Sequence, residues 1–102
     1  MSTLGKELQQ TIRNLENIRD LQKPPSNDVL AKLDTLYAQQ IDLIDAAIQK
    51  GTAKYINATE AMNAAAKKTQ EAIDDLAKLE QAIEKVANAI GKVTELLAKV
   101  PG

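Results

Sequence analysis

The sequence has no cysteine, no histidine, no tryptophan and no phenylalanine among its 102 residues. Without cysteine there is neither a disulfide framework nor thiolate chemistry, so nothing indicates a redox compartment. Without histidine the chain lacks the most common general acid or base and the usual partner of carboxylates in helical metal sites. We therefore predict a protein that is not an enzyme and has no catalytic, cofactor-binding or metal site.

A large charge of one sign is also absent, because 13 basic residues stand against 14 acidic ones. A nucleic-acid-binding domain needs a basic face, and binding to an anionic membrane by charge needs one too. No run approaches the ~18 apolar residues of a membrane span, and no apolar signal core follows Met1. We expect no nucleic acid and no membrane among its partners, and a cytoplasmic location, with export by a route without a cleaved signal left open.

The residues that are abundant, chiefly alanine, leucine, isoleucine, lysine, glutamate and glutamine, are mostly good helix formers. The first helix is expected over about residues 3–22. Its apolar side chains recur at spacings of three and four and define one face: Leu4, Leu8, Ile12, Leu15, Ile18 and then Leu21 or Gln22. A proline turn at residues 23–27 ends it, and either Ser26 or Asn27 can cap the next helix.

The second helix is expected over about residues 28–50, with a wide apolar face that suits contact with at least two neighbouring helices. Its central stripe is Leu30, Leu33, Tyr37, Ile41, Ile44 and Ile48, widened by Val29, Leu36, Leu43 and Ala47. A turn is predicted near Gly51, because glycine can end a helix and the following Thr52 can cap the next one.

From residue 53 to residue 99 the chain has no proline, and we expect one long third helix with a possible break near residues 64–69. Its first part, residues 53–72, is rich in alanine, which lets another helix approach closely. An unbroken helix would be roughly 70 Å long, about twice the length of the others, and would leave half of its apolar face uncovered. With a break, four helices could close on themselves as a monomer.

The last part repeats every seven residues, from residue 77 to residue 100, which indicates left-handed packing against other helices. The positions beside the seam are largely apolar, so a bundle of three or more helices fits better than a two-stranded coiled coil. We predict an all-α fold for residues 1–102: an antiparallel bundle of three, or possibly four, helices. The candidate interface is the repeat itself: Leu76, Leu79, Ile83, Val86, Ile90, Val93, Leu97 and Val100.

Other conspicuous side chains have simpler explanations than chemistry. The carboxylate pairs Asp42–Asp45, Asp74–Asp75 and Glu80–Glu84 and the doublet Lys67–Lys68 are expected on solvated helix faces. Tyr37, Tyr55 and Met62 are expected in the core or at its rim, with the tyrosine hydroxyls at the edge.

These patterns favour a helical protein-interaction module: an adaptor, a small chaperone, or a regulatory or structural subunit. Its expected partner is another protein or a second copy of the chain in a homo-oligomer. The alternative is an exported or membrane-active small helical protein of a bacterial secretion or toxin system.

Overall fold

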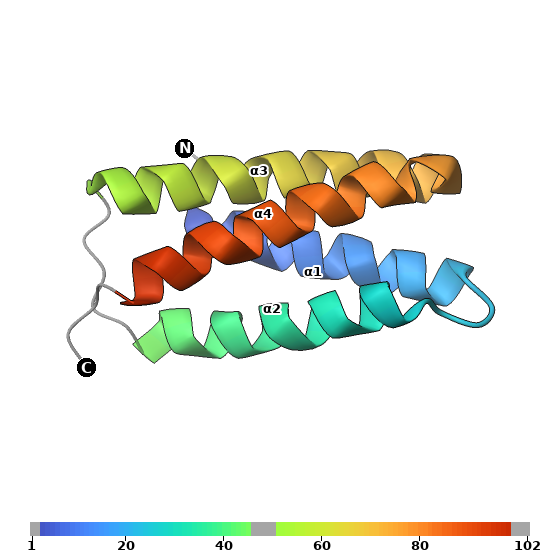
Figure 1. Ribbon diagram of the computed structural model, residues 1–102, viewed down its shortest axis with the longest axis horizontal. Coiled ribbons are helices and arrows are strands. Elements are labelled where there is room, and N and C mark those ends of the chain that lie inside the picture. Colours follow the sequence, from blue (N-terminus) through green and yellow to red (C-terminus); the bar gives the residue numbers. More distant parts are fainter. Residues whose placement is uncertain (1–2, 46–50, 99–102) are drawn as a thin grey trace.

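The computed structural model describes residues 3–45 and 51–98, and within these ranges the chain is helical and contains no strand (Figure 1). The helices pack into a bundle, which confirms the predicted fold class. In chain order the elements are α1 (Leu4–Leu21), α2 (Asn27–Asp45), α3 (Ala53–Asp74), the short 3₁₀ turn η1 (Leu76–Lys78) and α4 (Leu79–Ala98).

Three of the helices begin at a hydroxyl side chain that accepts a hydrogen bond from the first turn, as caps do. The Thr3 hydroxyl accepts from the Lys6 amide at 3.3 Å, and the Thr52 hydroxyl accepts from the Tyr55 amide at 3.3 Å. At the proline turn it is Ser26, and not Asn27, that caps α2, by accepting from the Val29 amide at 3.3 Å. The predicted extension of α2 through residues 46–50 lies outside the described residues.

The long third helix is the one element that differs from expectation, because the chain breaks at Asp75 and not near residues 64–69. Asp75 takes an extended conformation, and its carboxylate accepts a hydrogen bond from the Ala77 amide at 3.1 Å. Aspartate favours such local bonds over a continued helix. No glycine or proline marks this break. It produces the fourth helix, so the four-helix alternative is the one that forms.

The bundle consists of two helical hairpins, α1 with α2 and α3 with α4, laid against each other (Figure 1). Helix α3 runs beside α1 in the same direction, and α4 runs beside α2 in the same direction. Hydrogen bonds between the hairpins hold this register. Each joins residues that are 51 to 56 positions apart in the chain.

Most inward positions of the first hairpin recur in the second, the exceptions being Asn14, Gln39, Val93 and Leu96. In α1 they are Leu4, Leu8, Thr11, Ile12, Leu15 and Ile18, and 54 residues later in α3 they are Ala58, Met62, Ala65, Ala66, Thr69 and Ala72. In α2 they are Val29, Leu33 and Leu36, and 53 residues later in α4 they are Ala82, Val86 and Ala89. The two hairpins therefore share a pattern of burial but differ in side-chain size. The small residues of α3 permit close approach to its neighbours, and α3 makes the most extensive contacts, with α4 and α1.

Candidate interaction surface

The stripe predicted from the seven-residue repeat lies partly inside the bundle. Val86 and Val93 are completely buried, so within this fold a partner cannot reach them. Leu76, in η1, has 42% of its surface exposed. The half-buried members line the rim of the core: Leu79, Ile83, Ile90 and Leu97. Val100 lies outside the described residues.

The buried face of α4 is rotated from the predicted seam toward one of its flanks. Besides the two valines, Ala82, Ala89 and Leu96 are buried. The turn at Asp75 folds α4 back along α3, whose buried side chains are mostly alanines. Two alanine-rich faces can approach more closely than two faces of branched residues, so the alanine flank of α4 is the one that turns inward.

A buried amide joins α1 to α3. Asn14 is almost completely buried, and its Nδ2 donates to the Ala66 carbonyl at 2.9 Å and to the Thr69 hydroxyl at 3.1 Å. Its Oδ1 accepts from Gln10 Nε2 at 2.9 Å. Buried polar groups need such partners, and a satisfied network fixes the register of the helices that it joins.

A second amide joins α2 to α4 in the same way. Gln39 Nε2 donates to the Ile90 carbonyl at 3.1 Å and to the Thr94 hydroxyl at 3.0 Å. Both amides therefore bond a threonine hydroxyl and a backbone carbonyl one turn before it. They differ in one respect, because Gln39 Oε1 is buried and has no hydrogen-bond partner. The junction of α2 with α4 is thus less completely satisfied than that of α1 with α3.

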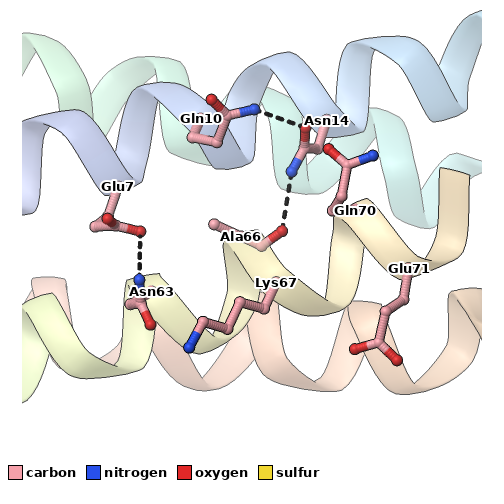
Figure 2. A pocket seen from close by; sticks show the side chains of 8 residues that line it. All are labelled: Glu7, Gln10, Asn14, Asn63, Ala66, Lys67, Gln70 and Glu71. Carbon is pink, nitrogen blue, oxygen red and sulfur yellow. Dashed lines mark hydrogen bonds between the residues drawn. The ribbon is translucent and has the colours of Figure 1, made fainter. Parts of the chain in front are cut away.

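An open groove of about 460 Å³ runs over the junction of α1 and α3 (Figure 2). Polar side chains that line the groove are hydrogen-bonded between the two helices. Asn63 Nδ2 donates to Glu7 Oε2 at 2.9 Å, and Asn14 Nδ2 donates to the Ala66 carbonyl. In Figure 2, Glu71 extends away from these bonded pairs, whereas the Lys67 side chain runs back toward Asn63. The groove is therefore the outer side of the hydrogen-bond network that joins α1 to α3. Its lining residues are Glu7, Gln10, Asn14, Asn63, Ala66, Lys67, Gln70 and Glu71.

The two most exposed large apolar side chains of the described residues, Ile44 and Ile41, lie on α2. Ile41 is 61% exposed, Ile44 is 79% exposed and Leu30 is 39% exposed. With half-buried Tyr37 and exposed Asp34, they follow one another at spacings of four, three, four and three residues, which places them on one side of the helix. We call Leu30, Asp34, Tyr37, Ile41 and Ile44 the α2 strip.

The charge at the edge of the α2 strip is negative. The Tyr37 hydroxyl donates a short hydrogen bond to Glu16 of α1, and this bond, with a smaller contribution from burial, raises the pKa of Tyr37 above its ordinary value of 10.0. One turn further along α1, Arg19 lies 3.3 Å from Asp20, and their hydrogen bond raises the pKa of Arg19. Its cation therefore already has a carboxylate partner, whereas Asp34 is exposed within the strip.

Most of the other charged residues singled out in the sequence lie on solvated faces. Asp42, Asp74, Asp75, Glu80 and Glu84 are exposed, as is Lys67, whereas Lys68 is half-buried and pairs with Glu71 at 3.5 Å. The Asp45 side chain lies outside the described residues. In the described part of the chain, no group of three or more candidate ligands could hold a metal ion. No helix among the same residues is long and apolar enough to cross a membrane.

Sequence reasoning placed the α2 residues on an apolar stripe but did not separate the covered ones from the exposed ones. Leu33 is buried and Ile41 is exposed, although both belong to the predicted stripe. The width of the face indicates that two neighbouring helices do not cover all of it, but it does not tell which flank stays exposed. Tyr37 and Tyr55 lie at the rim as expected, and the Tyr55 hydroxyl accepts a hydrogen bond from the Leu4 amide at 3.1 Å.

Comparison of the chain with protein-family models, with curated proteins and with solved structures finds no match. The function of the α2 strip is therefore inferred from its own chemistry.

Proposed function

We propose that the chain is a non-enzymatic helical interaction module, an adaptor or regulatory subunit, that binds another protein through the α2 strip. The observation that carries this proposal is the exposure of Ile41 and Ile44 side by side on one helix face. Scattered exposed apolar residues are ordinary on a protein surface, but a contiguous apolar patch is typical of an interface.

We place the interface on α2 and not on the repeat of α4 because two members of that repeat, Val86 and Val93, are completely buried in the bundle. Helix α2 suits this role because it is the least covered of the four. Its contacts with α1 and α4 are less extensive than those of α3 with the same two helices. Among the described residues, 3–45 and 51–98, one flank of its wide apolar face has no neighbour, so binding a partner would complete its burial.

A partner other than a second copy is favoured by charge. A two-fold dimer through the α2 strip would bring the same surface of both copies together. The Asp34 and Glu16 carboxylates of both copies would then lie on the same interface, and like charges brought together across an interface are unfavourable. Self-association through this strip is therefore disfavoured relative to a partner of different charge.

Site-specific photo-crosslinking in the cells that make the protein tests the proposal. A benzophenone amino acid is placed at Ile41 or Ile44, and at Ile56 as a matched control. Ile56 is an isoleucine of α3 with 46% exposure that lies outside the strip. We expect positions 41 and 44 to crosslink one common protein that position 56 does not reach. Equal products at all three positions, or adducts only between copies of the chain, would overturn the proposal.

A further inference from the structure

Resting on that proposed function, we infer that the occupant of the α2 strip is a cationic amphipathic helix of the partner protein. The strip combines apolar anchors with carboxylates, and each feature constrains the occupant. Leu30, Tyr37, Ile41 and Ile44 supply the anchors, and Asp34 lies among them.

The shape of the strip fits a helix. Its anchors extend over the 14 residue steps from Leu30 to Ile44, which is about 21 Å or four helical turns. They are side chains of one helix at spacings of three and four, so they form the ridge that a second helix packs against. An amphipathic helix of about four turns, with apolar residues at i, i+3, i+4 and i+7, offers the matching face.

The charge of the strip selects a basic occupant. Of the described charged side chains of α2, which are the exposed aspartates Asp28, Asp34 and Asp42 and the lysine Lys32, only Asp34 lies within the strip. Lys32 is two residues from Asp34 and therefore points to a different side of the helix. An occupant with lysine or arginine beside its apolar face would meet Asp34 directly and Glu16 at the edge, whereas an acidic one would be repelled.

Two nearby groups, Glu16 and Arg19, affect how much negative charge the strip offers to a basic occupant. Glu16 already accepts the Tyr37 hydroxyl, but a carboxylate has further acceptor positions. Arg19 is the one α1 cation in electrostatic contact with Tyr37, and it is paired with Asp20. Asp34 is therefore the carboxylate that a basic occupant meets directly, and Glu16 contributes at the edge.

Binding of three synthetic peptides to the purified chain tests the inference by fluorescence anisotropy. The first is a helix of roughly 16 residues with leucine at spacings of three and four and lysine elsewhere. The second replaces every lysine by glutamate, and the third scrambles the order of the first. We expect the first to bind with a Kd of about 10–100 μM, more weakly as salt increases, and the others at least about tenfold more weakly.

Variants of the chain locate the contact. The double substitution Ile41→Ser with Ile44→Ser should weaken binding of the cationic peptide by at least about tenfold, because it removes two apolar anchors. Asp34→Asn should weaken it by about two- to fivefold, the effect of one exposed ion pair. The matched controls are Ile56→Ser and Asp42→Asn, which remove an exposed isoleucine and an exposed aspartate outside the strip and should leave the Kd unchanged. Thermal melting verifies that every variant is folded.

The outcomes separate this inference from the proposed function. If the acidic peptide binds as tightly as the cationic one, and both need Ile41 and Ile44, the charge of the occupant is wrong and the proposed function stands. If no peptide binds, or the control variants weaken binding as much as the strip variants, the inference is overturned and the crosslinking result alone decides the function. A dimer of the unmodified chain that the double substitution dissociates would overturn both.

Discussion

The two hairpins place side chains of different size at equivalent inward positions. The first, α1 with α2, contributes mostly leucine, isoleucine and valine, whereas the second, α3 with α4, contributes mostly alanine. One hairpin therefore supplies volume and the other supplies close approach. A core of fixed packing density can be filled in this asymmetric way. The first hairpin therefore carries more large apolar residues than the core takes up, and some of them, such as Ile41 and Ile44, lie exposed on α2.

The largest expected effect comes from reversing this asymmetry at one equivalent pair, Leu36 of α2 and Ala89 of α4. Both are completely buried, and they are 53 residues apart, level with each other in the register set by Gln39. Leu36→Ala should lower the free energy of unfolding by about 2–5 kcal/mol through the cavity that it leaves. Ala89→Leu should lower it by about 1–3 kcal/mol through overpacking.

The double variant Leu36→Ala with Ala89→Leu sharpens the comparison, because it exchanges the volumes and conserves their sum. We expect urea denaturation to show that the double variant is more stable than the sum of the two single effects requires. Simple additivity would show that the two positions do not share the same space and that the hairpins are not complementary there.

The two buried amides give the next effect in size. Asn14→Leu removes a fully bonded side chain and should lower the free energy of unfolding by about 1–3 kcal/mol. Gln39→Met also removes two hydrogen bonds, but it removes the unpartnered Oε1 as well, so its net cost should be below about 1 kcal/mol. Thermal denaturation of both variants measures the difference. A larger loss for Gln39→Met would mean that the junction of α2 with α4 carries more of the stability than its contacts indicate.

Much of this architecture is readable from the sequence, and the parts that are not have identifiable reasons. The caps, the proline turn and the start of α3 follow from local chemistry at Ser26 and Thr52, because a cap depends only on neighbouring residues. The break at Asp75 was missed because its signal is one aspartate within a repeat that runs through it without a change of phase. The competition between a local side-chain bond and a continued helix is decided by the packing of α4 on α3.

The candidate interface shows the same limit for function. A seven-residue repeat gives the period of an apolar face, but it does not tell which flank meets a neighbour. In α4 the alanine flank at Ala82 and Ala89 turned inward because α3 is also rich in alanine, a property of the partner helix. In α2 the exposed flank at Ile41 and Ile44 could be recognised only after the positions of α1 and α4 were known.

A smaller effect comes from the exposed side of the hairpins. Gly91 lies in the middle of α4, exposed, and an added Cβ would meet no atom within 4 Å. Its equivalent in α2, 53 residues earlier, is Ala38. Gly91→Ala should raise the free energy of unfolding by about 0.5–1 kcal/mol, and Ala38→Gly should lower it by a similar amount. Urea denaturation measures both changes in the free energy of unfolding. If they differ in magnitude, the backbones of the two helices are not equally ordered.

The smallest expected effect concerns the bond between α1 and α2 at the edge of the strip. Donation to Glu16 raises the pKa of Tyr37 above 10.0, and an unfolded chain would release this proton first as the pH increases. The stabilisation is therefore fully present below pH 10 and is lost as the pH rises through the higher pKa of the folded protein. The stability advantage of the unmodified chain over Tyr37→Phe should shrink over this range, followed by urea denaturation at fixed pH steps. The same comparison is made in chains that carry Glu16→Gln, which keeps an acceptor but removes the charge. There the advantage of tyrosine over phenylalanine should decrease less with pH. An advantage that stays constant with pH would show that the hydroxyl does not bond Glu16 in solution, leaving that carboxylate free to meet a basic partner.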